Sequence, residues 1–309
     1  MKHLMNHEKH YITFNNYLKD RFHDKVFRVS LNAGFTCPNR DGLKSTKGCI
    51  YCSNKLSGDF AGDIFDDFST QFKKGVELES KKWQSSTYIA YLQAGTNTYG
   101  NVEHLRKIYN EIINIDKFIK VLSIATRPDC INEEIVSLLK EINTKCEVWI
   151  ELGFQTMHEA TSLFINKCYN NQDFEYAINL LNNAGIKVIV HIINGLPYET
   201  KEMMIDTVKY LNQFNLFGIK IHMLHVMKDT ILGDLYLKES FKLLSLEEFV
   251  EVTVEQLRHL KTNIVIHRLT GDAPRDLLIE PLWTLKKFVV LNEIDKYMRK
   301  HNYYQGDLC

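Results

Sequence analysis

The sequence predicts an α/β fold, a partial (β/α)6 barrel of the kind that stays open, with a short C-terminal extension. Apolar, β-rich runs recur along the chain with helical patterns between them, and runs such as 88–92 and 188–193 hold almost no polar residue. Such runs are typical of parallel strands covered on both faces. Six strand–helix units are too few to close an eight-stranded barrel, so we expect an open one.

The elements follow one another in a regular order. The expected strands are 26–31, 87–92, 119–125, 147–153, 187–193 and 219–224. After the second strand, Val102, Leu105 and Ile108 share one helical face, and a similar face later in the chain ends at Gly185, a typical helix C-cap. Because helices connect the strands, the crossovers should be right-handed and the sheet parallel.

The remaining sequence continues the same domain, because no linker rich in proline and glycine divides the chain. A helix from about 246 to 260, a strand-like run at 264–269 and a last helix from about 283 to 300 come after the six units. The expected parts are an N-terminal extension packed on the barrel (1–24), a barrel core (25–230) and an extension that covers the substrate side (231–309).

Composition narrows the class of protein. With 309 residues and 45% hydrophobic side chains the chain can bury a large core, and 38 basic against 38 acidic residues give no global attraction to nucleic acid. No run of 18 apolar residues predicts a membrane span, and the polar N-terminus has no signal core. We expect a cytoplasmic protein whose seven cysteines serve metal or redox chemistry rather than disulfides.

Three cysteines form the most informative feature. Cys37, Cys49 and Cys52 follow the first expected strand in one short run that holds no fourth cysteine or histidine. A structural zinc site fills four positions, and an iron–sulfur cluster usually takes four cysteines. Three thiolates therefore predict a metal site with one open position for a substrate or cofactor. A non-enzymatic zinc-binding module, completed by a nearby histidine, is the alternative.

The runs GFTCPNRDG and GCIYC resemble the radical S-adenosylmethionine (SAM) enzymes, and the order of features matches from about residue 24 to 270. The family usually has three and two residues between its cysteines, whereas this chain has eleven and two. The wide gap resembles the branch of the elongator catalytic subunit. The run is most similar to a small bacterial family associated with modification of the tRNA wobble uridine.

The resemblance implies two cofactors and a mechanism. Three thiolates would hold a 4Fe-4S cluster, and the fourth iron would bind the amino and carboxylate groups of SAM. One electron, from a reductant such as flavodoxin or ferredoxin, would then cleave SAM to methionine and a 5′-deoxyadenosyl radical. The protein would orient the reactants and exclude water and oxygen.

The resemblance also implies cofactor contacts at the strand ends. Tyr51 would lie against the adenine. The other implied contacts are Gly95, Thr96, Asn97, Glu151, Gln155, Lys167, His191, Asn194, His222 and Leu224. An ionised carboxylate inside a strand, as at Glu151, needs a partner. The sequence departs from the family at Ala125, where relatives often have glutamate, at Lys167 for arginine, and at His191 for an acidic residue.

The substrate is implied mainly by the family. The resemblance implies radical editing of the C5 substituent of wobble uridine, from carboxymethylaminomethyl to aminomethyl, with tRNA as partner. Arg127, Arg268 and Asp272 are the candidates for substrate binding. Basic residues of the last helix, bordered by Tyr303 and Tyr304, suit phosphate contacts and base stacking, although a solvated helix face explains them equally. A radical SAM enzyme acting on a small metabolite or peptide is the alternative.

Overall fold

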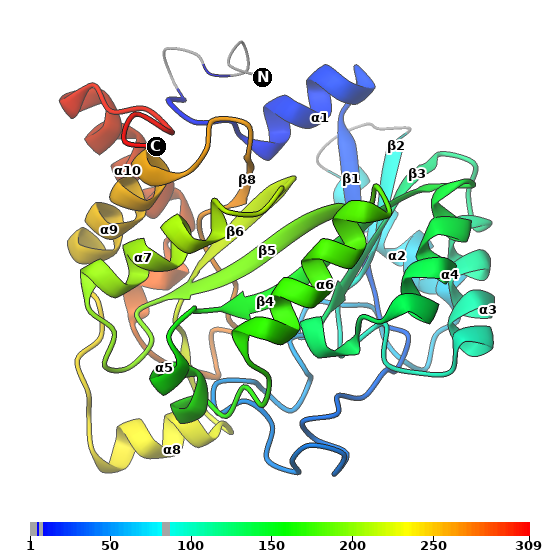
Figure 1. The fold of residues 1–309 in the computed structure, drawn as a ribbon, viewed down its shortest axis with the longest axis horizontal. Coiled ribbons are helices and arrows are strands. Elements are labelled where there is room, and N and C mark those ends of the chain that lie inside the picture. The colour runs from blue at the N-terminus through cyan, green and yellow to red at the C-terminus, as the bar shows by residue number, and fades with distance from the viewer. Residues whose placement is uncertain (1–4, 6–8, 82–86) are drawn as a thin grey trace.

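The computed structural model describes residue 5 and residues 9–81 and 87–309. A curved sheet of seven strands, in the order β1-β2-β3-β4-β5-β6-β8, forms its centre, and every neighbouring pair is parallel (Figure 1). The first six strands are β1 (Val26–Leu31), β2 (Thr87–Leu92), β3 (Ile119–Thr126), β4 (Glu147–Gln155), β5 (Lys187–Asn194) and β6 (Gly218–Met223). The predicted fold class is confirmed, and each expected strand is present within two residues of its expected bounds.

The sheet has one strand more than the six predicted units. The strand-like run after residue 264 becomes β8 (Val265–Arg268), which pairs with β6 across an irregular register between Ile219 and Lys220. A second, two-stranded antiparallel sheet joins β7 (Val226–Met227) to β9 (Leu278–Glu280). The region after residue 230 thus adds a strand to the barrel itself, and the division into parts stays a proposal.

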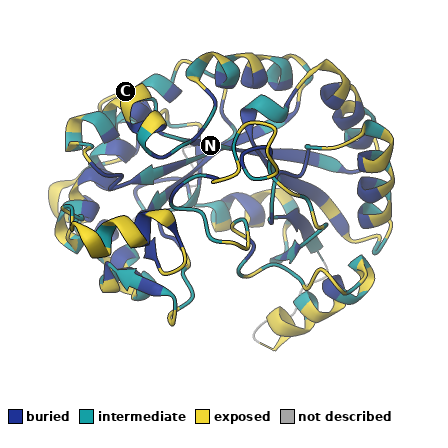
Figure 2. Ribbon diagram, turned by 90° about the horizontal axis from the view of Figure 1, so that it is seen from below, coloured by how far each residue is buried: buried dark blue, intermediate teal, exposed yellow. Residues whose placement is uncertain are grey.

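Helices surround the sheet, most of them against its outer face. They are α1 (Phe14–Phe22), α2 (Phe68–Ser80), α3 (Val102–Ile113), α4 (Glu133–Asn143), α5 (Glu159–Phe164), α6 (Asn171–Asn183), α7 (Lys201–Leu211), α8 (Ile231–Lys238), α9 (Leu246–His259) and α10 (Lys287–His301), with 3-10 turns at Pro128–Cys130 and Leu282–Leu285. Their buried sides face the strands and their exposed sides face outward (Figure 2). The last helix begins later than predicted, because the 3-10 turn and the non-helical Lys286 precede it. None of the described helices is both long and apolar enough to cross a membrane.

One end of the barrel is filled by apolar side chains. Tyr17 and Leu18 of α1 pack with Trp149 and with inward residues of the neighbouring strands in one buried cluster. The segment before α1 also extends the sheet edge, because the Ile266 N–H donates to the Ile12 carbonyl at 2.8 Å. The helix α1 and the C-terminus lie at this closed end, opposite the loop that follows β1 (Figure 1). Ligands therefore meet the barrel at the carboxyl ends of its strands.

Candidate functional site

The loop after β1 folds the wide cysteine gap back on itself. The Lys44 N–H donates to the Pro38 carbonyl at 2.8 Å, and the Gly48 N–H donates to the Asn39 carbonyl at 2.6 Å. A further turn bond joins the Cys52 N–H to the Cys49 carbonyl at 3.0 Å. The eleven intervening residues thus form a closed loop that returns the second and third cysteine to the first.

Two residues of the CPNR run support the cysteines. The fully buried Asn39 donates from Nδ2 to Cys49 Sγ at 3.5 Å and to the Asn166 carbonyl at 2.6 Å. Arg40 donates from Nη2 to the Cys52 carbonyl at 2.6 Å. The sequence did not identify these residues. Their only signal was their position directly after the first cysteine.

Arg127, a predicted substrate ligand, lies beside the cysteine loop. Its Nη1 is 4.0 Å from Cys37 Sγ, while Nε and Nη2 each donate to Asp129 at 2.9 Å. Lys44 of the loop reaches the same carboxylate at 2.9 Å. Because this guanidinium is already paired, a contact to substrate stays a prediction.

Three of the predicted cofactor contacts, Gly95, Thr96 and Asn97, belong to a segment that holds the cysteine loop against the sheet. Gly95 has a φ of +77°, and a Cβ there would lie 2.2 Å from the Phe35 carbonyl oxygen. The Thr96 N–H donates to the Thr36 carbonyl at 3.0 Å. Asn97 donates from Nδ2 to the Ala125 carbonyl at 2.8 Å. This segment therefore lies beside the cysteines, and its contact with SAM stays a prediction.

Lys167 is fully buried among carbonyl groups. Its Nζ donates to the Phe154 carbonyl at 3.2 Å and to the Thr156 carbonyl at 3.3 Å, and burial lowers its pKa to about 8. Nearby, Gln155 has a φ of +65° and accepts from the Tyr169 hydroxyl at 2.7 Å. Both predicted cofactor contacts are thus engaged within the protein, and their contact with SAM stays a prediction.

Tyr51, predicted to lie against the adenine, meets side chains from two other parts of the chain. Tyr51 of the cysteine loop packs in one apolar cluster with Leu196, just after β5, and Leu224, just after β6. The side chain of Asn194, in contrast, exchanges hydrogen bonds with Gln256 of α9 at 2.7 and 2.9 Å. A contact from that amide to the cofactor would require this pair to open.

Glu151 is the centre of a charged network inside the barrel. It accepts from Ser123 at 2.7 Å and from His191 Nε2 at 2.8 Å, binds Lys220, and lies 3.3 Å from Arg28 Nη2. Burial raises the pKa of Glu151, but the charges of Lys220 and Arg28 outweigh it and hold the pKa well below its usual value. The expectation that this carboxylate is paired is confirmed.

Histidines and a second charged group border this network. Burial lowers the pKa of His191 to about 4, and that of His222, whose ring lies 5.2 Å from the His191 ring, is lowered too. At the end of β8 the structure brings Arg268 and Asp272 together as an ion pair, and Lys287 binds the same carboxylate. The substrate candidates of β8 therefore meet one another at the barrel mouth.

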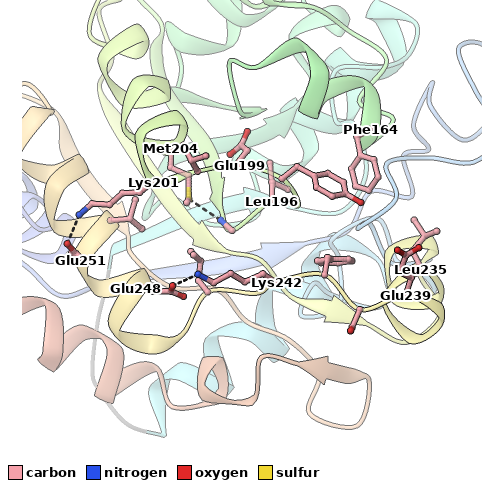
Figure 3. A pocket seen from close by; sticks show the side chains of 17 residues that line it. Phe164, Leu196, Glu199, Lys201, Met204, Leu235, Glu239, Lys242, Glu248 and Glu251 are labelled. Atoms are coloured by element: carbon pink, nitrogen blue, oxygen red, sulfur yellow. Dashed lines mark hydrogen bonds and ion pairs between the residues drawn. The ribbon is translucent and has the colours of Figure 1, made fainter.

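A cavity of about 730 Å³ lies outside the barrel, between α7, α8 and α9 (Figure 3). The turn after β5 lines it with Leu196, and two ion pairs, Lys201–Glu251 and Lys242–Glu248, border it at 2.5 Å each. None of the three cysteines and none of the Glu151 network lines it. The cavity is therefore distinct from the cysteine site.

The donor set at the cysteine loop fits an iron–sulfur cluster. Cys37, Cys49 and Cys52 are free and partly exposed, and N–H donors face the first two sulfurs. Burial raises the pKa of Cys49 to about 11, so iron has to displace its proton. Among the described residues no three His, Cys, Asp or Glu side chains converge as a single metal ion needs. Thiolates that bind three separate irons do not have to converge.

Comparison with known protein families identifies the chain. Residues 36–211 match the Radical SAM superfamily, and residues 217–300 match the Radical_SAM C-terminal domain. The chain belongs to the radical SAM superfamily. It is a radical SAM enzyme, and members of this superfamily bind a 4Fe-4S cluster and SAM. The family assignment replaces the alternative of a non-enzymatic zinc-binding module.

Individual relatives place the chain within this superfamily. It is 42% identical over 301 residues to YtqA of Bacillus subtilis (strain 168), across 97% of this chain and 93% of YtqA. It is 28% identical over 184 residues to a tRNA uridine(34) acetyltransferase of Methanocaldococcus jannaschii, across 58% of this chain and 33% of that protein. The solved structure of Elp3 from Methanocaldococcus infernus has the same fold, with a TM-score of 0.69 at 20% identity, covering 91% of this chain and 64% of that one. These relatives are consistent with the elongator-like branch.

Proposed function

We propose that this radical SAM enzyme modifies the C5 side chain of tRNA wobble uridine, converting a carboxymethylaminomethyl group to aminomethyl. The 5′-deoxyadenosyl radical would take a hydrogen atom from the carbon between the nitrogen and the carboxylate. Return of one electron from that carbon to the cluster would leave an imine, and addition of water would release the two lost carbons as glyoxylate. The observation that carries the proposal is the similarity, over more than half of this chain, to an enzyme named for uridine 34 of tRNA. The wide cysteine gap, folded into a closed loop, supports the same branch.

In this proposal Cys37, Cys49 and Cys52 hold the 4Fe-4S cluster. When bound, the cluster supplies one electron, delivered by a reductant such as flavodoxin or ferredoxin, that cleaves SAM to a 5′-deoxyadenosyl radical. Asn39 and Arg127 direct N–H groups to the sulfurs of Cys49 and Cys37 and so stabilise their negative charge.

The ends of β5 and β6 would position the rest of SAM. The apolar cluster of Tyr51, Leu196 and Leu224 offers a surface for the flat adenine ring next to the cysteine loop. The substrate base would enter at the same mouth of the barrel. Bases of an anticodon loop are unpaired and can splay out of the stack without melting a duplex.

The test is anaerobic incubation of the reconstituted enzyme with SAM, dithionite and bulk tRNA, followed by mass analysis of the nucleosides. We expect 5′-deoxyadenosine together with loss of the carboxymethylaminomethyl nucleoside and gain of the aminomethyl nucleoside. A Cys49→Ala variant should yield neither product. Formation of 5′-deoxyadenosine with unchanged nucleosides would sink the tRNA assignment and favour a small metabolite or peptide.

A further inference from the structure

The charged network inside the barrel holds two basic side chains against one carboxylate. Glu151 is the anion of the network, whereas Arg28 and Lys220 both place a cation against it. Burial lowers the pKa of His191 and of His267, so these neighbours are neutral. Below about pH 7, where Lys220 is protonated, the network within the described part of the chain therefore carries one more cation than anion. Buried charge of this kind is costly unless a counter-ion is present.

Arg28 has hydrogen-bond donors to spare. Its Nε and Nη2 are buried, and neither makes a hydrogen bond within the described residues, although Nη2 lies 3.3 Å from Glu151 as an ion pair. In Arg127, the same two nitrogens each donate to Asp129 at 2.9 Å. The Arg28 guanidinium is also fixed in place, because it lies over the rings of Phe14 at 5.1 Å and Tyr91 at 4.8 Å. An oriented guanidinium without a hydrogen-bonded acceptor suits an incoming carboxylate.

Small residues lie between this network and the barrel mouth. Ser30, Ala125 and Gly153 each follow a network position by two residues on their strand, so they share its inward face. All three are partly exposed, although they belong to the sheet at the centre of the fold. Ala125 is also the position where relatives often have glutamate. The Arg28 side chain is itself 24% exposed, so it is not sealed off from solvent.

We propose that Arg28 and Lys220 bind a carboxylate of the substrate inside the barrel. In the superfamily the SAM carboxylate is bound to iron at the cysteine loop. Glu151, at the centre of the network, lies four residues before the end of β4. It is therefore about 13 Å further into the barrel than that strand end, which borders the cysteine loop. The missing anion is therefore assigned to the substrate. That it belongs to a carboxymethylaminomethyl group rests on the proposed function.

Binding to the anaerobically reconstituted, SAM-loaded enzyme tests the inference by calorimetry. The probes are two matched pairs: N-acetylglycine with N-acetylglycinamide, and 5-carboxymethylaminomethyluridine with its amide. We expect each carboxylate to bind about tenfold or more tightly than its neutral partner. Arg28→Gln should remove that difference, and Arg28→Lys should restore part of it. Arg106→Gln, on the outer helix α3, is the matched control and should behave as the wild type.

Three outcomes would overturn the inference. Equal affinities for carboxylate and amide in the wild type would do so, and so would full discrimination in Arg28→Gln. The third is a loss of SAM affinity in Arg28→Gln without loss for decarboxylated SAM, which would assign the anion to the cofactor. The two proposals can also fail separately. If the wild type prefers carboxylates, Arg28→Gln loses that preference and tRNA nucleosides stay unchanged, the anion site is supported and only the tRNA substrate is rejected.

Discussion

At the residue scale, Gly95 joins the sheet to the cysteine loop. A side chain here meets both the positive φ of +77° and the Phe35 carbonyl at 2.2 Å. We predict that Gly95→Ala displaces the loop and lowers cluster content after anaerobic reconstitution, measured as iron, sulfide and visible absorption. Gly185→Ala is the matched control, since its φ is +70° but no atom lies within 4 Å of the added Cβ. The control should lose about 1 kcal/mol of stability and keep its cluster. Equal cluster content in both variants would show that Gly95 does not hold the cysteine loop in place.

Asn39 is the second residue whose role the loop geometry defines. Its amide donates to Cys49 Sγ at 3.5 Å, and hydrogen bonds to the ligating sulfurs set the potential of an iron–sulfur cluster. Asn39→Ala should make the cluster harder to reduce and should cost about 1 to 3 kcal/mol, because the Asn166 carbonyl loses its donor. A redox titration followed by electron paramagnetic resonance measures the first effect. Asn183→Ala, exposed at the end of α6, should leave the potential unchanged.

These residues also define what the sequence could predict about the site. The cysteine spacing predicted an open metal site because the three thiols are close in sequence. Asn39 and Arg40 escaped prediction because their acceptors, Cys49 and Cys52, become neighbours only when the gap closes. The need of Glu151 for a partner was predictable, but the identity of Lys220, 69 residues later, was not.

At the element scale, the strands of the barrel were predictable because helices cover their outer faces and make them almost continuously apolar. The membership of β8 in the sheet was not predictable. The short strand β7 and two helices separate it from β6, and its pairing is short and irregular. Local sequence specifies that a strand forms, whereas its partner depends on packing far along the chain.

The charge network across the strands predicts a coupled loss of stability. Glu151→Gln leaves Arg28 and Lys220 without their anion and should cost about 3 to 5 kcal/mol of unfolding free energy. Adding Lys220→Met should recover part of this loss, because the double variant removes a cation together with its partner. Urea unfolding of the protein without its cofactors measures both effects. Strictly additive losses would show that the two side chains do not interact.

The lowered pKa of Lys220 in this network predicts a pH dependence of folding stability. Burial lowers the pKa of Lys220 to about 7, although Glu151 acts to raise it, and Arg28 and Arg268 lower it further. Between about pH 7 and its ordinary value of 10.5, the unfolded chain binds this proton and the folded protein does not. The contribution of Lys220 to stability is therefore unfavourable below pH 7 and is relieved as the pH rises.

Carboxylate affinity should follow the opposite course, because Lys220 loses its charge as the pH rises through 7. We expect N-acetylglycine to bind the SAM-loaded enzyme more weakly at pH 8.5 than at pH 6. Lys220→Met should flatten this dependence while the affinity for N-acetylglycinamide stays constant. A wild-type affinity independent of pH would exclude Lys220 as an anion ligand.

At the scale of the whole molecule, the basic residues of α10 lie at two different ends of the barrel. Its first turn lies at the mouth, where Lys287 binds Asp272 just after β8. Its last turn lies at the closed end, where the Tyr303 carbonyl hydrogen-bonds His10 at 2.8 Å. The 15 residues of the helix separate these ends by about 22 Å. The sequence grouped these residues because they share one helix, but substrate can meet the cluster only at the mouth.

This division predicts which lysine contacts tRNA. Lys286 is exposed at the mouth, whereas Lys300 is exposed near the closed end. If the anticodon loop enters at the mouth, Lys286→Gln should weaken tRNA binding and reduce the slope of log affinity against log salt by about one. Lys300→Gln removes the same charge and should change neither quantity. Filter binding across a salt series measures both, and equal effects of the two substitutions would mean that RNA is held by overall charge rather than by the mouth of the barrel.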